Sequence, residues 1–428
     1  MAAPTGALGR VQGVALYVGA VLGSGVLLIP GVSAEVAGPG ALIAWALMSL
    51  LTLPLALTMT TLAARFPGGG GVATFAEKAF GKTAAAVTGW FFLLAVPIGT
   101  PLVAIIGATY ISTAFGLPDG TRAGLACAIA AVAFGANYFG IRTASFVQVG
   151  VVSALAATLV VAIAGALPHT DPARFQPFLP HGVLGVAQAM ALLFWCFIGW
   201  EAVTYLSGEF TNPGRDLVPA VVIAAFVVAI LYLGSAFVII GTGQYGGQAT
   251  AASLVLVIRA SLGHIAGGVA GAVAFCSCVA VDIAYVGGAS HLARALSEKN
   301  MAPRWLGWTH QRYGTPIGGL LVIATGTAII LGLSFTGVLT VRSLIALPTA
   351  NFILTYVLGC AAGVALARNG MERTLAIVAL AASVAVAPFL GWALLYPLAI
   401  GIAVSLRRVP LDLRGEAASS ELEYKREA

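Results

Sequence analysis

The chain has 428 residues, of which 60% are hydrophobic and 8% are charged. Soluble globular proteins carry about 25% charged residues, so this composition excludes an ordinary soluble protein and indicates a polytopic membrane protein. The formal charge of +6 comes from lysines and arginines scattered between apolar runs, which is typical of membrane topology. These residues do not form the single basic face that nucleic acid binding requires.

Polar and Gly/Pro-rich breaks divide the chain into twelve apolar segments. Each has roughly 17 to 30 residues, which is long enough for a helix to cross a hydrocarbon core that needs about 20. We therefore expect an all-α polytopic membrane protein with twelve transmembrane helices. The segments lie near residues 11–36, 40–64, 84–115, 123–139, 145–167, 184–209, 217–241, 264–296, 316–334, 339–367, 373–389 and 391–406.

The distribution of basic residues predicts the topology. With the N-terminus in the cytoplasm, 17 of the 21 lysines and arginines fall on the cytoplasmic side. The positive-inside rule then places both termini in the cytoplasm of a multi-pass protein of the cytoplasmic membrane. The segment before Arg10 does not resemble a cleavable signal, because it runs directly into a span that is too long for one. The five cysteines show no metal-binding or disulfide spacing, so we expect no metal site.

The first apolar segment is interrupted in its middle by Gly23-Ser24-Gly25. Glycines allow the backbone to leave helical geometry, and the freed polar groups are tolerated in a membrane only beside a ligand or cavity. The half-helix after the break presents amide N–H groups that suit a carboxylate, and the carbonyls before it, near Val21 and Leu22, suit an ammonium group or a cation. Together they fit an amino acid zwitterion. Close packing of membrane helices through small residues is the alternative.

The third segment carries Pro97, Gly99 and Pro101, which should kink the helix near the middle of the membrane. Thr100 lies among these residues and becomes a candidate for the wall of a pocket. In the tenth segment, Pro348 and the polar pair Thr349 and Asn351 complete a plausible cavity wall.

The sixth segment contains a second interruption, at Gly199, and places Glu201 at the middle of the membrane. An ionisable residue at that depth is a functional candidate, although it can also be a hydrogen-bonded strut that holds the broken helix. The neighbouring aromatic residues Trp195, Phe197 and Trp200 are either packing residues or lids over a ligand.

The eighth segment carries Ser277 and a second intramembrane acid, Asp282. Either acid could take up and release a proton, and Asp282 could also ligate a cation. A structural pairing of Asp282 with a backbone donor is the alternative.

The chain resembles the amino acid–polyamine–organocation (APC) transporters. Four stretches carry the resemblance: GSG followed by LLIPG, RFPGGGGVATFAEKAFG, FWCFIGWEAVTYLSGEFTNPGRDLVPA and ARALSEKNMAP. Within the superfamily, the third stretch is most similar to bacterial exporters of L-methionine and branched-chain amino acids. The resemblance implies a LeuT-like fold of two inverted five-helix repeats with broken helices one and six. Its expected organisation is a cytoplasmic N-terminus (1–10), a first repeat (11–167), an external loop (168–183), a second repeat (184–367), two trailing helices (368–406) and a cytoplasmic tail (407–428).

The resemblance also implies roles for single residues. The substrate carboxylate would bind the amides of Gly23, Ser24 and Gly25. The amino group would bind the carbonyls of Val21, Trp195 and Ile198, with Trp195 and Trp200 as gating residues. Proton-coupled relatives often carry a lysine in helix five, which is missing from residues 144–167. That departure means that the lysine cation is replaced by Na⁺, by another group or by nothing. We expect H⁺ as the coupling ion, with Na⁺ as the alternative and with Glu201, Asp282 and Ser277 as the coupling candidates.

The leading functional hypothesis is a secondary transporter, not an enzyme. It would export neutral hydrophobic amino acids (L-methionine, leucine, isoleucine and valine) by alternating access with proton antiport. One alternative is uptake, or exchange of cationic amino acids or amines. A second alternative is a membrane receptor that binds an amino acid without transporting it. We expect no cofactor, no nucleic acid partner, and a monomer or homodimer in the lipid bilayer. ATP-driven transport is excluded because the sequence has no GxxxxGK[ST] motif.

Overall fold

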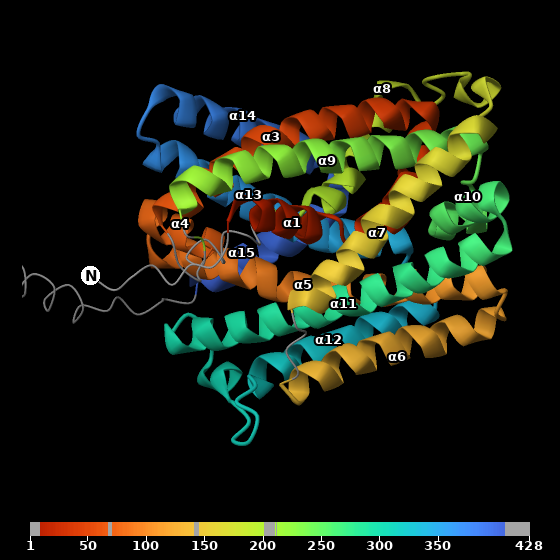
Figure 1. Ribbon diagram of the computed structural model, residues 1–428. Coiled ribbons are helices and arrows are strands. Elements are labelled where there is room, and N and C mark those ends of the chain that lie inside the picture. The colour runs from red at the N-terminus through yellow and green to blue at the C-terminus, as the bar shows by residue number, and fades with distance from the viewer. Residues whose placement is uncertain (1–8, 67–70, 141–144, 201–209, 211, 407–428) are drawn as a thin grey trace, which may run out of the picture.

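The computed structural model describes residues 9–66, 71–140, 145–200, 210 and 212–406. Within these ranges most of the chain is helical, and an isolated β-bridge joins Thr309 and Pro316. The helices run roughly parallel to one another as a bundle (Figure 1). The expectation of an all-α fold is therefore confirmed.

The first half of the chain begins with a pair of short helices, followed by longer ones. In order these are α1 (Arg10–Val21), α2 (Gly25–Ala37), the 3-10 turn η1 (Gly38–Gly40), α3 (Ala41–Arg65), α4 (Gly71–Phe80), α5 (Lys82–Phe115), α6 (Asp119–Tyr138) and α7 (Ser145–Ala166).

The second half begins after two short turns, η2 (Leu167–His169) and η3 (Pro172–Phe175). It continues with α8 (Gly182–Leu193), η4 (Phe194–Phe197), α9 (Pro213–Thr242), η6 (Gly247–Ala252), α10 (Ser253–Leu262), α11 (His264–Glu298), η7 (Arg304–Gly307), α12 (Ile317–Phe335), α13 (Val341–Leu366), α14 (Gly370–Val386), η8 (Ala387–Leu394) and α15 (Leu395–Leu406).

Eight helical stretches among the described residues are long and apolar enough to cross a membrane. Two of these stretches, residues 25–65 and 370–406, each join two of the expected segments through a 3-10 turn. The helices of a broken span are too short to qualify alone, since α1 has 12 residues and α2 has 13. An integral membrane protein is supported, whereas the count of twelve crossings and the inverted repeat stay predictions.

Some regions of the structure bear directly on the expected segments. The prolines Pro97 and Pro101 lie inside α5, which is helical over all 34 residues, and the kink expected there stays a prediction. The stretch between α9 and α11, which lies between two of the expected membrane segments, contains the amphipathic helix α10. Gly391, which lies where the expected segments 373–389 and 391–406 meet, has φ of +57° inside the 3-10 turn η8.

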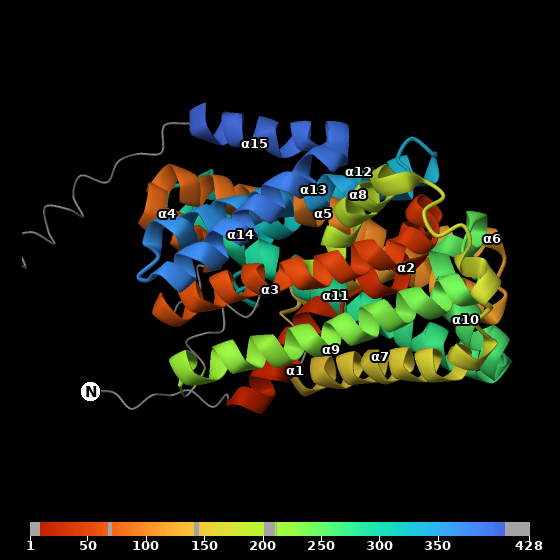
Figure 2. The same cartoon turned by 90° about the horizontal axis from the view of Figure 1, so that it is seen from above.

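Helix α5 lies at the centre of the bundle and packs closely against α11. Glycines allow this approach: a Cβ on Gly89 would lie 2.8 Å from a methyl of Leu296, and one on Gly107 would lie 2.9 Å from Cys278 Cβ. In the second view, α15 lies along one edge of the bundle and α7 and α9 along the other (Figure 2). The contact between α5 and α11 forms one wall of the cavity described below.

Candidate functional site

The first predicted helix break is present. Helix α1 ends at Val21, and the N–H of Gly23 donates to the Val21 carbonyl at 2.7 Å, which closes a tight turn. Helix α2 then begins at Gly25, and its N-cap residue Ser24 provides no side-chain cap. In the described chain, the N–H groups of Ser24 and Gly25 donate no backbone hydrogen bond. These donors and the positive end of the α2 dipole favour an anionic group at this position.

The second break directly contacts the first. After η4 the backbone of Ile198 is extended, with ψ of 140°, and Gly199 has φ of +127°. A Cβ on Gly199 would lie 2.4 Å from the carbonyl oxygen of Ala20, so only glycine fits between the two breaks. A Cβ on Gly25 would likewise lie 2.8 Å from Cys196 Sγ. The two interruptions that the sequence predicted therefore form a single unit.

Tyr232 of α9 joins the two breaks. Its hydroxyl lies 2.8 Å from the carbonyl oxygen of Val21 and 3.0 Å from that of Cys196, and it donates its one proton to this pair of acceptors. The Val21 carbonyl thus already accepts from Tyr232 and from the Gly23 amide before any ligand is considered. Sequence reasoning missed Tyr232, because a tyrosine inside an apolar span is more often a packing residue and no motif marks it.

A cavity of about 920 Å³ adjoins the first break. Its wall comes from α1, α2, α5, α7, α11 and the second break, and most of its lining side chains are apolar. Nine of the predicted site residues line it: Val21, Gly23, Ser24, Gly25, Thr100, Trp195, Ile198, Ser277 and Asp282. The structure therefore brings most of the predicted site residues to one place, and their binding roles stay predictions.

Trp195 lies between the break and α5. A Cβ on Gly25 would be 3.1 Å from its Cδ1, and one on Gly99 would be 3.2 Å from its Cη2. The indole therefore spans the cavity wall from α2 to α5, in a position where it could cover a ligand.

Phe197 and Trp200 do not belong to the cavity lining, which differs from the expectation. Phe197 is buried in an aromatic cluster, with ring centroids 6.0 Å from Trp45 and 5.4 Å from Tyr232. Trp200 is fully buried, 6.0 Å from the ring of Tyr17. Phe197 lies in the 3-10 turn η4 and Trp200 in the non-helical residues 198–200, so neither side chain follows the α-helical period from which its direction was expected.

Glu201 lies outside the described residues, so its predicted role stays a prediction. The second predicted acid, Asp282, is described and lies in the cavity wall with 1% of its surface exposed. Its Oδ2 has no hydrogen-bond partner, and neither do Thr100 Oγ1 and Ser277 Oγ. The alternative in which Asp282 pairs with a backbone donor is not supported by these contacts.

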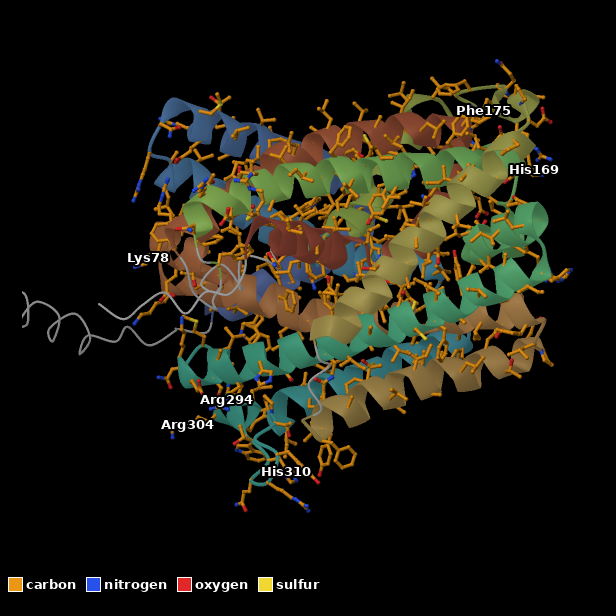
Figure 3. All side chains as sticks on the ribbon, viewed as in Figure 1. Lys78, His169, Phe175, Arg294, Arg304 and His310 are labelled. Carbon is orange, nitrogen blue, oxygen red and sulfur yellow. The ribbon has the colours of Figure 1, made fainter. Side chains whose placement is uncertain are left out.

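The cavity lining extends from the breaks to one end of the bundle. There it reaches Glu77 of α4 and Lys299, whose charged groups are 3.5 Å apart and whose side chains are 30% and 56% exposed. Lys78, Arg294 and Arg304 lie at this end, whereas His169 and Phe175 lie at the opposite one (Figure 3). The basic residues thus gather at the end that the positive-inside rule assigns to the cytoplasm.

A helix broken between α1 and α2 meets the non-helical end of α8 and η4 at a cavity within a bundle of apolar helices, an arrangement that is typical of secondary transporters. The family model described as amino acid permease matches residues 8–405. The chain belongs to this family, the amino acid permeases of the APC type. Family and relatives are transporters and not enzymes, as the sequence predicted.

Three bacterial relatives show the extent of the similarity. The uncharacterized amino acid permease YecA of Bacillus subtilis is 34% identical over 92% of this chain and 93% of its own length. The L-methionine/branched-chain amino acid exporter YjeH of Escherichia coli is 30% identical over 91% and 93%, respectively. The branched-chain amino acid permease BcaP of Bacillus subtilis is 27% identical over 76% and 74%.

Proposed function

We propose that this permease is a secondary transporter that exports neutral, mainly apolar amino acids by alternating access in antiport with protons. The observation that carries the proposal is the largely apolar cavity beside the free amides of Ser24 and Gly25. The amides suit the carboxylate common to all amino acids, and the apolar wall suits an aliphatic or thioether side chain. The names of the exporter and of the branched-chain permease support this substrate class.

The path of the cavity supports the alternating-access mechanism. The lining reaches the end with Glu77 and Lys299, so the arrangement is open toward the side that we expect to be cytoplasmic. None of the described lining residues comes from the opposite end of the bundle, where the turns η2 and η3 lie, so the cavity lining shows no opening on that side. A second state would have to close the first opening and open a path on that side.

A second candidate function is the exchange of cationic amino acids or amines. The observation that favours it is Asp282, a carboxyl group in the cavity wall without a partner among the described residues. If the substrate carried an additional positive charge, this carboxylate would be its natural partner.

Purified protein in liposomes loaded with unlabelled methionine is expected to accumulate radiolabelled methionine or leucine by counterflow. The outward gradient of unlabelled methionine drives the exchange through one site, so no ion gradient is needed. Arginine in the external buffer should compete weakly, since the substrate site offers mainly apolar contacts. Uptake of arginine or a polyamine in place of the neutral amino acids would support the second candidate. Binding without any flux would instead indicate a receptor.

Substituting Gly23 by valine is expected to reduce this counterflow about tenfold or more, because a side chain there removes space beside the free amides. A Cβ on Gly23 has no atom within 4 Å, so the valine enters the cavity without distorting the protein. Gly332→Val is the matched control, since Gly332 of α12 also has open space and lies outside the cavity lining. Equal counterflow in both variants and the wild type would place the substrate elsewhere.

A further inference from the structure

The connection between α11 and α12 forms a loop that hydrogen bonds hold to its neighbours. The hydroxyl of Ser297, near the end of α11, donates to the Pro303 carbonyl at 3.1 Å. The hydroxyl of Thr315 donates at 3.1 Å to the carbonyl of Tyr138, the last residue of α6. His310 of this loop projects from the side of the bundle, near its basic end (Figure 3). The loop is therefore fixed both to α11 and to α6.

The loop adjoins helices whose outer faces are apolar. Val132 on α6 and Leu321 and Ile329 on α12 are exposed, and in a membrane such side chains contact the lipid tails. At the loop the exposed side chains become aromatic, with Phe139 after α6 and Trp308 before α12. Aromatic side chains such as tryptophan gather at the boundary between lipid tails and headgroups. The loop therefore lies at the level of the headgroups, on the side that the positive-inside rule assigns to the cytoplasm.

His310 fixes the backbone at the tip of the loop. Its Nδ1 accepts hydrogen bonds from the backbone N–H groups of Arg312 and Tyr313, at 3.2 and 3.4 Å. The N–H of Gly314 donates in turn to the His310 carbonyl at 2.8 Å. These bonds close a tight turn, so the backbone positions of Arg312 and Tyr313 are set before any ligand binds.

Aromatic rings pack around this turn. The Tyr313 ring stacks on the His310 imidazole with centroids 4.8 Å apart, and Tyr138 meets the imidazole edge-on at 5.3 Å. Phe139 packs edge-on against Tyr313 at 5.6 Å. The guanidinium of Arg312 lies over the Tyr313 ring, with its Cζ 5.5 Å from the centroid. We call these five residues the Arg312 cluster. Stacking on an aromatic face restricts the arginine and leaves the N–H donors at the edge of its guanidinium plane available to an anion.

The protein does not compensate the charge of the Arg312 cluster. Residues 299–318 include three basic side chains, Lys299, Arg304 and Arg312, and no aspartate or glutamate. Lys299 pairs with Glu77 of α4. Arg304 and Arg312 are exposed and form no ion pair with any described residue. An exposed arginine of this kind favours an external anion, and its planar guanidinium matches the oxygens of a phosphate group.

The position of the cluster favours a lipid over a dissolved phosphate ion. A dissolved ion would meet only the guanidinium, whereas the glycerol and acyl chains of a phospholipid also contact an exposed ring such as that of Phe139. Anionic lipids of the cytoplasmic leaflet attract basic side chains that lie close to the membrane. The sign of the charge and the apolar surface beside it therefore both match an anionic phospholipid.

We propose that the Arg312 cluster is a binding site for the headgroup of an anionic phospholipid in the cytoplasmic leaflet. Arg312 pairs with the phosphate, Tyr313 supports the guanidinium from below, and His310 positions the backbone of both. Because the cluster joins the loop to the end of α6, a lipid bound there stabilises the folded state. This binding is independent of the transported substrate.

The test is thermal unfolding of the purified, delipidated protein in detergent micelles that contain phosphatidylglycerol or phosphatidylcholine at the same mole fraction. We expect the melting temperature of the wild type to be about 2 °C higher with phosphatidylglycerol. Arg312→Gln should lose most of this difference. The matched control is Arg373→Gln, which removes the same charge from an exposed arginine of α14, on the other side of the bundle (Figure 1), and should keep the difference.

Native mass spectrometry of the same proteins, titrated with phosphatidylglycerol, gives a second measurement that does not depend on unfolding. The wild type and Arg373→Gln are expected to retain one more tightly bound phosphatidylglycerol than Arg312→Gln does. Phosphatidylglycerol that binds and stabilises all three proteins equally would overturn the site, since general attraction to a basic protein would then explain the effect. Inorganic phosphate in phosphatidylcholine micelles is the remaining condition, at an ionic strength matched with sodium chloride. An equal gain from inorganic phosphate would show an anion site without lipid and would also overturn the proposal.

Discussion

Replacing Gly199 by alanine is expected to abolish amino acid counterflow and to lower the stability of the fold by about 3 kcal/mol or more. Two effects add. The residue has φ of +127°, a conformation that side-chain-bearing residues rarely adopt, and its Cβ would lie 2.4 Å from the Ala20 carbonyl oxygen. Relief of this contact requires the two helix breaks to separate, which displaces the cavity wall at Val21. The melting temperature and methionine counterflow measure both consequences.

Gly182→Ala separates backbone strain from the contact. Gly182 also has positive φ, at +61°, but its Cβ would meet no atom within 4 Å. This control should lose about 1 kcal/mol of stability and keep its counterflow. If Gly199→Ala behaves like Gly182→Ala, the close contact between the breaks does not matter for transport.

The sequence predicted the position of both breaks because glycine within an apolar run is a strong local signal. The first lies at Leu22 to Ser24 and the second at Ile198 to Gly199, as expected. The direction of each side chain near a break was not predictable, since a helical period no longer applies once the backbone leaves the helix. Phe197 and Trp200 therefore point into packed clusters, although both stand next to cavity residues.

The surroundings of the two glycines in the first break, Gly23 and Gly25, were not predictable from the sequence either. Both could be expected to face a ligand, yet a Cβ on Gly25 would press on Cys196 while one on Gly23 would enter open space. Both glycines line the cavity, but only the three-dimensional contact between the breaks shows that Gly25 also packs against Cys196. Helix α10 escaped prediction for a different reason, because its ten residues are too few to resemble a membrane span.

Tyr232→Phe is expected to reduce methionine counterflow about tenfold while the melting temperature falls by only a few degrees. The substitution keeps the aromatic ring, which packs edge-on against Trp45 and Phe197 at 5.1 and 5.4 Å between centroids. It removes the hydroxyl that holds the carbonyls of Val21 and Cys196. Val21 keeps its bond from the Gly23 amide, whereas Cys196 loses the donor, so the second break is released more than the first.

The matched control is Tyr396→Phe. Its hydroxyl donates to the Leu94 carbonyl at 3.0 Å, so the same atom is removed from a bond to a backbone carbonyl away from the breaks. A purely structural role for Tyr232 would lower stability and counterflow in parallel in both variants. A positioning role predicts that Tyr232→Phe alone loses counterflow beyond its loss of stability, because the two breaks must move as one unit to close around a substrate. Equal counterflow in the two variants would contradict that role, and the breaks would then be held together by the contact between Gly199 and Ala20 alone.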